Sequence, residues 1–273
     1  MKKIIIITSN SIRHRAFRVF LSNYKNIKIL LTISEKGKNN INNIIKKKSE
    51  KNLNISLQEH LDDRNQIERD FFDLYLKKTN DNSKNIYKNY GYSSSKKFLE
   101  KINKLNPDLI VVYGSSLIKG EILQHYRNKI INVHLGLSPY YKGSGTNYFA
   151  FVNNEPEYVG ATFMYMDHTI DGGEIIHQIR PKIYKKDSLH QVGTRLILEM
   201  FDTYGQIILN FNKIKKKGNI KPKKVKIYKR KDFNLTSLRK LNHHLKNNMI
   251  EKYLKKKKLR DRKVVLIKQD WIR

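Results

Sequence analysis

The chain opens with a buried strand, an amphipathic helix and a second buried strand, and this order restricts its fold more than any other feature. Lys2–Thr8 contains the uninterrupted apolar run Ile4–Ile7, and Ile27–Ser34 is rich in β-branched residues, which favour strands. Residues 12–24 between them place their apolar side chains on one helical face. Because two strands joined through a helix pair in parallel, we predict an α/β fold with a mostly parallel, twisted sheet flanked by helices.

Hydrophobic periodicity extends this pattern along the chain. Apolar residues three and four apart predict a helix over Leu57–Leu76, and the same spacing from Leu189 predicts a long helix capped by Asp187 or Ser188. Residues 77–93 are polar and predict a loop. The other predicted elements are helices over Ser93–Leu105, Gly120–Arg127 and Asn234–Leu254, strands over Leu109–Tyr113, Ile130–His134, Val225–Tyr228 and Val264–Ile267, and an antiparallel pair over Glu157–Asp167 and Glu174–Lys182.

Composition divides the chain into three parts. Residues 1–212 contain the strand and helix pattern of the predicted sheet and form one α/β domain. Residues 213–224 begin a segment dense in Lys and Arg, which predicts a basic linker. Residues 225–273 are too short for a standard domain and predict a small helical C-terminal appendage. The role of residues 35–93 is open, because they either cover a ligand pocket or decorate the sheet.

The chain contains no cysteine, which excludes disulfides, thiol nucleophiles and thiolate metal sites. Its formal net charge is +32. The positive charge is spread over loops and elements alike, which is typical of a solvated surface. The run Ile4–Ile7 is too short for a secretory signal, and no segment approaches the roughly 20 apolar residues of a membrane helix. We therefore expect a cytoplasmic protein without membrane or nucleic-acid partners. A polyanion-binding surface at residues 213–231 is the non-enzymatic alternative.

Asn132, His134 and Asp171 are the polar residues whose arrangement points most clearly to chemistry. Asn132 and His134 are two apart on a predicted strand, so both side chains point to one face at its carboxyl end, where ligands bind in open α/β sheets. Asp171 lies in a glycine-rich turn that can fold back over this strand end. An amide and an imidazole can stabilise a developing oxyanion, and a carboxylate can accept a proton from an amine. These residues favour direct acyl transfer between two bound substrates.

The same region resembles the folate-dependent formyltransferase family. The resemblance is strong over about residues 105–182 and weaker but compatible over residues 1–34. It rests on an ordered series of motifs: Asn132-Val-His134, Leu137-Ser-Pro139, Tyr141-Lys-Gly143, Gly160-Ala-Thr162 and Asp171-Gly-Gly-Glu-Ile-Ile176. It implies a Rossmann-like formyltransferase fold with the catalytic domain in residues 1–212. It also implies transfer of a formyl group from 10-formyltetrahydrofolate to an amine, without a covalent enzyme intermediate.

The resemblance further implies roles for individual residues. Asn132 and His134 would contact the formyl oxygen, and Asp171 would organise proton transfer and a water molecule. The pterin of the donor would lie between a strand-end loop and the turn that holds Asp171. Backbone groups of these two segments would recognise the edge of the pterin. The implied donor-binding residues are Gly114, Ser115, Leu117, Ile118, Met166 and Asp167. No metal is expected, because the histidines outside this region lack companions spaced like metal ligands.

Departures from the family pattern restrict the amine acceptor. Thr8–His14, after the first strand, lacks the glycines of the phosphate loop in glycinamide ribonucleotide formyltransferases. The C-terminal appendage is much shorter than the tRNA-binding barrel of methionyl-tRNA formyltransferases and begins as a helix. Small acceptors such as nucleotide-activated amino sugars remain, and Lys229–Phe233 resembles a segment of some sugar N-formyltransferases. A methionyl-tRNA formyltransferase-like enzyme and a formyltetrahydrofolate hydrolase are the alternatives.

Two segments are candidates for contacts with the acceptor. Asn10, Arg13 and His14 lie where the first strand meets a helix amino terminus, which is a natural anion site, although capping alone also explains the serines there. Gly143 and Ser144 belong to a tight turn on the acceptor side. If the protein forms a homodimer, we expect the C-terminal region to provide the contact.

Other polar residues are expected to be structural. The acidic residues of the Leu57–Leu76 helix, which include Glu68, should form its solvent side. His168 and His177 flank the motif series and should lie in loops or at the surface. Neither group requires a ligand.

Overall fold

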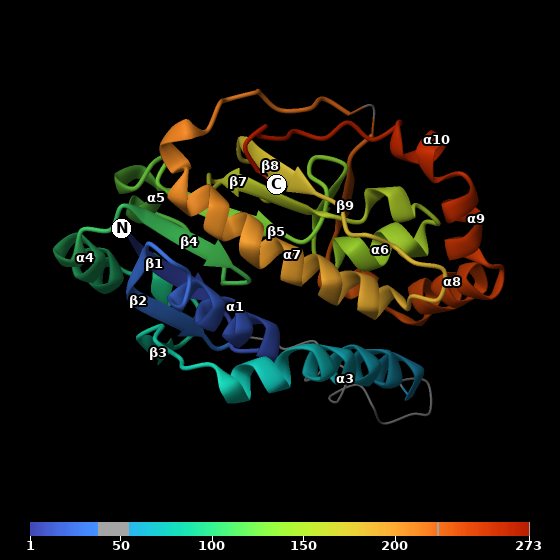
Figure 1. Ribbon diagram of the computed structural model, residues 1–273, viewed down its shortest axis with the longest axis horizontal. Helices are drawn as coiled ribbons and strands as arrows, with labels where there is room; N and C mark the ends of the chain where they lie inside the picture. The colour runs from blue at the N-terminus through green and yellow to red at the C-terminus, as the bar shows by residue number, and fades with distance from the viewer. Residues whose placement is uncertain (38–54, 223, 273) are drawn as a thin grey trace.

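A seven-stranded sheet forms the centre of the molecule (Figure 1). The computed structural model describes residues 1–37, 55–222 and 224–272. The strands are β1 (Lys2–Thr8), β2 (Ile27–Glu35), β3 (Asn85–Lys88), β4 (Leu109–Tyr113), β5 (Ile130–His134), β7 (Ala161–Tyr165) and β8 (Ile175–Ile179). Their order is β3-β2-β1-β4-β5-β7-β8, parallel from β3 through β5, with β7 antiparallel to both its neighbours. The predicted α/β fold with a mostly parallel sheet is confirmed.

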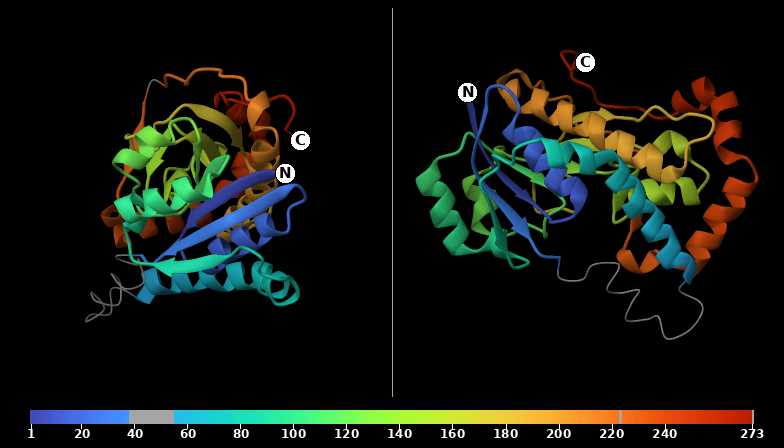
Figure 2. Two further views of the ribbon diagram at one scale, coloured as in Figure 1. Left: turned by 90° about the vertical axis from the view of Figure 1, so that its left-hand side faces the viewer. Right: turned by 60° about the horizontal axis from the view of Figure 1, so that its bottom comes forward.

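Helices cover both faces of this sheet, and the alternation of β1 side chains shows how. Ile4 and Ile6 pack into one helical layer, whereas Ile5 and Ile7 pack into the other, because successive side chains of a strand point to opposite faces. All four are fully buried, which explains the continuous apolar run in the sequence. One layer contains α1 (Ile12–Ser22), α3 (Ile55–Lys78) and α7 (Leu189–Leu209), and the other contains α4 (Lys96–Leu105) and α5 (Glu121–His125) (Figure 2).

The start of α7 follows from its capping residues. The Ser188 hydroxyl oxygen accepts a hydrogen bond from Gln191 N at 3.2 Å, and Gln191 Oε1 accepts one from Ser188 N at 2.8 Å. This capping box satisfies backbone donors that the first turn leaves free. Asp187 instead accepts hydrogen bonds from Arg195 at 2.8 and 2.9 Å. Of the two caps that the sequence allowed, the structure therefore selects Ser188.

The strand order reverses between β1 and β4, which opens a crevice at the carboxyl ends of these strands. Ligands of open α/β sheets bind in such a crevice. Thr8 at the end of β1 is paired with Tyr113 at the end of β4, and β5 follows β4 in the sheet. His134, the last residue of β5, therefore lies at the same edge as the crevice.

The residues after the predicted linker attach to the rest of the molecule through a small second sheet. In it, β6 (Tyr141–Gly143) pairs in parallel with β9 (Lys226–Tyr228), and the rings of Phe149 and Tyr228 stack with centroids 3.9 Å apart. Leu238 and Leu241 then join the same buried cluster as Phe149. The division into 1–212, 213–224 and 225–273 stays a prediction.

The remaining elements are α6 (Thr146–Val152), α8 (Leu235–Lys246), α9 (Met249–Lys255), α10 (Lys257–Asp261) and the 3-10 turns η2 (Tyr92–Ser94), η3 (Pro156–Tyr158), η4 (Phe211–Lys213) and η5 (Arg230–Asp232).

Three predicted elements were wrong. The helix expected over Asn234–Leu254 is divided into α8 and α9 because Asn248 adopts the left-handed conformation, with φ of 56°, which asparagine tolerates better than most residues. The polar segment 77–93 is not all loop, because β3 pairs along β2 at the sheet edge. Val264–Ile267 is not a regular strand, although the backbone of Ile267 bonds to Gln178 of β8 through both its carbonyl and its N–H.

The C-terminal tail explains the burial of His177, which was expected in a loop or at the surface. His177 lies on β8 and is 4% exposed. Its Nδ1 accepts a hydrogen bond from Gln269 N at 3.0 Å, and the Gln269 side chain donates to Ile176 O at 3.0 Å. The tail thereby covers part of an edge strand that would otherwise expose unpaired backbone groups.

The burial of His177 makes the stability of the protein depend on pH. Burial, reinforced by the charges of Lys268 and Lys217, lowers the pKa of His177 from 6.5 to about 4. Between these values the unfolded chain binds more protons than the folded one, so stability falls as pH drops from 6.5 towards 4. At pH 5 the part of this loss that is due to His177 should be on the order of 2 kcal/mol.

Unfolding by urea at pH 7 and pH 5 measures this effect. The His177→Gln variant should lose less stability between the two pH values than the wild-type protein does. The exposed residue His168 provides the control, because His168→Gln should keep the wild-type difference. Equal pH dependence in all three proteins would contradict the assignment to His177.

Candidate active site

Two of the three predicted polar residues come from β5. Asn132 is paired with Val112 of β4 and with Met164 of β7, and His134 is paired with Thr162 of β7. The strand thus has a neighbour on each side, which fixes the direction of its side chains. Asn132 and His134 point to the same face because they are two apart.

The third residue, Asp171, lies in the turn between β7 and β8. It adopts a left-handed conformation, with φ of 47°, and the turn continues through Gly172 and Gly173. A Cβ at Gly173 would lie 1.8 Å from the carbonyl oxygen of Tyr165, so only glycine allows the chain to pass there. The glycine pair therefore lets this turn fold tightly back towards the strand ends.

The Asp171 carboxylate is held from two sides. Its Oδ2 accepts a hydrogen bond from Gly143 N at 2.8 Å and lies 3.3 Å from Nδ1 of His134. The side chains of His134 and Asp171 are 8% and 15% exposed, so water has little access to the contact between them. The structure thus brings together two residues that are 37 positions apart (171 − 134).

The other nitrogen of His134 faces two oxygen atoms that the sequence did not indicate. Nε2 lies 3.2 Å from the carbonyl oxygen of Tyr141 and 3.2 Å from Oγ1 of Thr146. Thr146 gives its own hydrogen to the carbonyl oxygen of Leu135. Both groups can then only accept a hydrogen bond from the ring, which assigns a hydrogen to Nε2. The imidazole is consequently fixed at both of its nitrogen atoms.

A cleft of about 550 Å³ opens in front of these residues. Asn132, His134 and Asp171 all line it. Two predicted residues lie elsewhere: Ile118 is 1% exposed within the core, and Asn10 is exposed outside the cleft. The other predicted residues that line the cleft are Gly114, Ser115, Leu117, Met166, Asp167, Arg13, His14, Gly143 and Ser144.

The loop after β4 is positioned by Glu35, which sequence reasoning missed. Glu35 ends β2 and is 2% exposed. Its Oε1 accepts hydrogen bonds from the backbone and hydroxyl of Ser93 at 2.8 and 2.7 Å, and its Oε2 accepts one from Ser116 N at 3.0 Å. A buried carboxylate with three donors holds the wall of the cleft in place. No local pattern marks this role, because Glu35 simply follows a strand.

A second hollow of about 340 Å³ meets the cleft at His134. The two hollows share His134, the turn 143–145, Arg13 and Arg230. The α3 helix forms one wall of the second hollow through His60, Arg64 and Glu68, so residues 55–78 cover a pocket, one of the two roles left open for them. Residues 38–54 lie outside the described residues.

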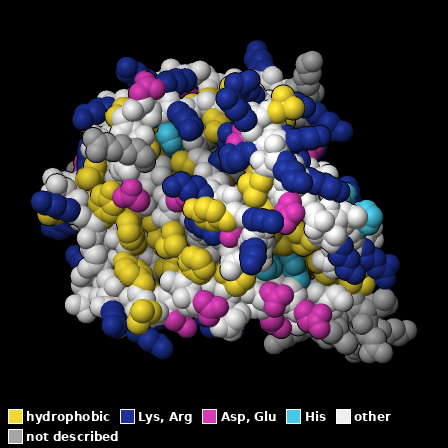
Figure 3. Space-filling view, turned by 45° about the vertical axis from the view of Figure 1, so that its right-hand side comes forward, with side chains coloured by type: hydrophobic (Ala, Val, Ile, Leu, Met, Phe, Trp, Pro, Cys, Tyr) yellow, Lys and Arg dark blue, Asp and Glu magenta, His cyan; other side chains and the backbone are white. Residues whose placement is uncertain are grey.

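Glu68 corrects an expectation from the sequence. It was placed on the solvent side of its helix with the other acidic residues, but it is 3% exposed and bonds to Arg13 at 2.7 Å. The spacing held a signal for this, because positions 60, 64 and 68 repeat every four residues and so share one helix face. The rest of the acidic row lies along the lower edge of the molecule over α3 (Figure 3).

The sheet order and the polar group at its carboxyl edge define an α/β protein of the doubly wound class. The formyl transferase family model matches residues 25–204 of the chain. The chain therefore belongs to the formyl transferase family, and the resemblance noted from the motifs is confirmed.

Methionyl-tRNA formyltransferases are among the curated proteins that are similar to this chain. The one from Finegoldia magna is 32% identical over 114 residues, which cover 41% of this chain and 36% of that protein. The one from Clostridioides difficile is 45% identical over 83 residues, or 30% of this chain and 26% of that protein. The chain thus matches about a third or less of the length of these relatives.

Solved structures share the fold at lower identity. A sugar N-formyltransferase from Shewanella sp FDAARGOS_354 has a TM-score of 0.54 and 17% identity, and the match covers 88% of this chain and 87% of that one. Phosphoribosylglycinamide formyltransferase from Anaplasma phagocytophilum has a TM-score of 0.54 and 15% identity, covering 84% and 98%. These neighbours confirm the formyltransferase fold.

Two further findings concern the part of the chain that the structure describes. No group of three or more His, Cys, Asp or Glu side chains there could hold a metal ion. No helix there is both long enough and apolar enough to cross a membrane.

Proposed function

We propose that this chain transfers a formyl group from 10-formyltetrahydrofolate to the amine of a small acceptor in the cytoplasm. We further propose that the acceptor is a nucleotide-activated amino sugar. The observation that carries the proposal is the meeting of two hollows at His134. A direct transfer needs the donor and the amine in contact at one reacting atom, with each held on its own side.

The larger cleft fits the folate donor, which supplies an activated formyl group on nitrogen. Its rim carries Leu117 and Ile170, which are 45% and 60% exposed and suit the flat face of a pterin. The backbone of the loop after β4 and of the turn at Met166–Asp171 borders the same space. Leu117 and Met166 therefore stay in the donor site that we propose, with Gly114, Ser115 and Asp167.

We assign Asn132 and His134 to the formyl oxygen. As the amine attacks the formyl carbon, this oxygen gains negative charge, and hydrogen-bond donors aimed at it lower the barrier. In the structure the Nε2 hydrogen of His134 is directed at Tyr141 O and Thr146 Oγ1, so the formyl oxygen takes the place of these acceptors when the donor binds. Asn132 contributes an amide donor on the same face of β5.

We assign the proton transfer to Asp171. A new bond forms between the amine nitrogen and the formyl carbon, and the bond from that carbon to the donor nitrogen breaks. The amine loses one proton and the departing nitrogen gains one, so the carboxylate, directly or through a water molecule, carries the proton between them. The hydrogen bond from Gly143 N, a residue that lines both hollows, holds the carboxylate in the larger cleft.

The experiment combines the protein with 10-formyltetrahydrofolate and a panel of nucleotide-linked amino sugars. Tetrahydrofolate and formylated amine should appear in equal amounts. Release of formate without any amine would instead identify a hydrolase. If no amine in the panel causes the donor to be consumed, the proposed acceptor class is wrong.

Methionyl-tRNA is the second candidate acceptor, because the curated relatives reported above are methionyl-tRNA formyltransferases. The net charge of +32 also favours a polyanionic substrate. The helical form of α8 and α9 differs from the barrel expected of tRNA-binding enzymes. Charged initiator tRNA in the same assay separates the two candidates, since only one of them should be formylated.

A further inference from the structure

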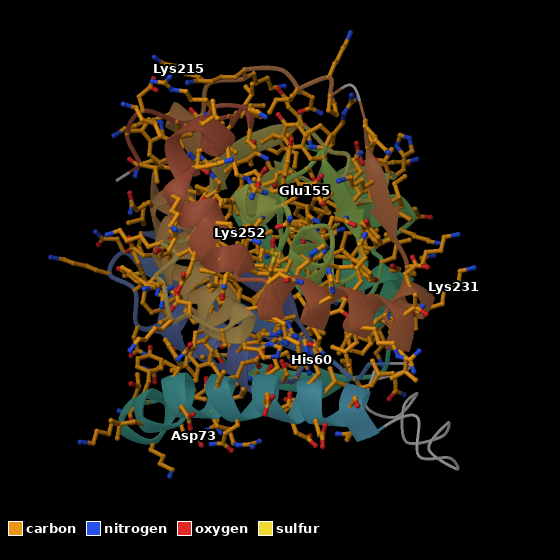
Figure 4. The ribbon with its side chains drawn as sticks, turned by 90° about the vertical axis from the view of Figure 1, so that its right-hand side faces the viewer. His60, Asp73, Glu155, Lys215, Lys231 and Lys252 are labelled. Atoms are coloured by element: carbon orange, nitrogen blue, oxygen red, sulfur yellow. The ribbon has the colours of Figure 1, made fainter. Side chains whose placement is uncertain are left out.

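The wall of the smaller hollow opposite η5 is built by α3. In the right-hand view of Figure 2, the amino-terminal half of α3 extends past the sheet towards the C-terminal helices. Figure 4 shows His60 on the side of α3 that faces the body of the molecule and Asp73 on the outer side. The inner side of this helix therefore presents its side chains to the hollow, while its acidic outer side faces solvent.

One carboxylate on this wall is shared by two guanidinium groups. Glu68 Oε1 lies 2.7 Å from Nη1 of Arg13 and 3.9 Å from Nε of Arg64. The Arg13 contact is a full hydrogen bond, whereas Arg64 is too distant to form one with Glu68. Nη2 of Arg64 donates a hydrogen bond to Oδ1 of Asn65 at 3.0 Å, whereas its Nε is buried and has no hydrogen-bond partner among the described residues. The charge of Glu68 is thus directed to Arg13, and that of Arg64 is left mostly uncompensated.

The electrostatics of Arg64 agree with this geometry. Burial, followed by the nearby charge of Arg13, lowers its pKa from 12.5 to about 10, and Glu68 does not restore it. Burial together with the charge of Arg64 lowers the pKa of His60 to about 4, and burial together with His60 and Arg64 lowers that of His190 to about 3. The two imidazoles are therefore neutral near pH 7 and add no charge to the hollow.

The opposite wall adds positive charge and aromatic rings. Lys229 and Arg230 line the hollow there. The rings of Tyr148 and Phe233 lie with centroids 5.1 Å apart, and the His60 ring lies 5.2 Å from that of Tyr148. Of the charged side chains that the structure describes, four cationic ones and the carboxylate of Glu68 line the hollow, so a bound anion would be attracted strongly. The rings suit a planar group beside it.

We propose that Arg64 binds the phosphate of a nucleotide-linked acceptor between α3 and η5, while the planar base packs against Tyr148 and Phe233. This inference rests on the proposed function, because it places the acceptor in the hollow that meets the donor cleft at His134. Glu68 acts as a positioning residue: it accepts a hydrogen bond from Arg13 and none from Arg64, so the positive charge of Arg64 is directed to the ligand.

This placement differs from the anion site expected at the β1–α1 turn. There, Oγ of Ser11 and Nδ1 of His14 are engaged with each other at 2.7 Å, and Arg13 is bound by Glu68. Asn10 lies outside both hollows. Ser11, His14 and Nη1 of Arg13 are occupied by contacts within the protein, although Nε of Arg13 is buried without a partner among the described residues. Arg13 therefore serves the site through Glu68 and not through the helix amino terminus.

Calorimetric titration of the full chain with uridine diphosphate, inorganic pyrophosphate and uridine tests the proposal without any turnover. Uridine diphosphate should bind more tightly than either of its parts. Arg64→Gln should weaken its binding about tenfold or more, because a charge-assisted contact is lost, and Arg64→Lys should recover part of the loss. Binding of uridine should change little in Arg64→Gln.

Arg69→Gln is the matched control, because Arg69 lies on the exposed side of the same helix. It should leave the binding of uridine diphosphate within about twofold of wild type. Should Arg64→Gln unfold at a lower temperature, Lys229→Gln on the opposite wall replaces it, with the same expected direction. Unchanged binding in the charge-removing variants, or no binding of either anion by the wild-type protein at millimolar concentration, would overturn the proposal.

The titration also separates this inference from the proposed function. If uridine diphosphate binds through Arg64 but no amine is formylated, the anion site stands and the formyl transfer fails. If a nucleotide-linked amine is formylated equally well by Arg64→Gln, the transfer stands and the site of the phosphate is wrong.

Discussion

Replacing His134 with glutamine or Asp171 with asparagine is expected to slow formyl transfer by about 10²–10⁴-fold. The two side chains meet at 3.3 Å, and each is held by further contacts from the turn at Gly143 and from Tyr141. Either change removes a donor or a proton carrier at the atom where charge develops. Initial rates of formylated product at saturating donor and acceptor provide the measurement.

Both variants keep the approximate size of the side chain, so their melting temperatures should stay near that of the wild-type protein. His168→Gln is the control, because His168 is exposed and lies three residues before Asp171. It should retain the wild-type rate. The roles proposed for His134 and Asp171 are wrong if both variants keep more than about half of the wild-type rate, since the loss of even one general acid–base group lowers a rate about 10²-fold.

The Phe17→Ala variant is expected to lose about 3–5 kcal/mol of folding free energy. Phe17 is fully buried and contacts three aromatic rings, with centroid distances of 5.3 Å to Tyr113, 5.5 Å to Phe201 and 5.4 Å to Tyr204. The substitution leaves a cavity between α1, α7 and the sheet that these rings cannot fill. Unfolding in urea should give the free-energy difference directly.

Phe71→Ala on α3 provides the matched comparison, because Phe71 is 37% exposed. The same chemical change there should cost no more than about 0.5 kcal/mol. If the two variants lose similar amounts of folding free energy, the packing of the rings around Phe17 does not stabilise the core between α1 and α7.

Local sequence patterns identified most elements of the fold. Lys2–Thr8 is a strand with the bounds expected, because four consecutive isoleucines can be buried only where both faces of a strand are covered. Ser188 could be recognised as a cap because a capping box involves residues only three apart. The strand β3 could not be recognised from the sequence, because an edge strand of four partly polar residues becomes regular only through its pairing with β2.

The candidate site shows the same division. Asn132 and His134 could be paired from the sequence, since the two-residue repeat of a strand sets their common face. Thr146, Glu35 and Glu68 could not be placed, because their partners are distant in sequence or are backbone atoms. Glu68 shows why: polarity predicts solvent exposure unless another part of the chain supplies a charge.

The sequence by itself determined most of the strands and helices and the motif series of this protein, because hydrophobic periodicity and glycine turns act over a few residues. Only the tertiary structure decided which charges meet. The contact of Asp171 with His134, and that of Arg13 with Glu68 across 55 positions, depend on how whole elements pack. Packing also placed α3 beside η5 and so formed the second hollow. Such contacts leave no local signal, because their energy arises only when distant segments exclude water together.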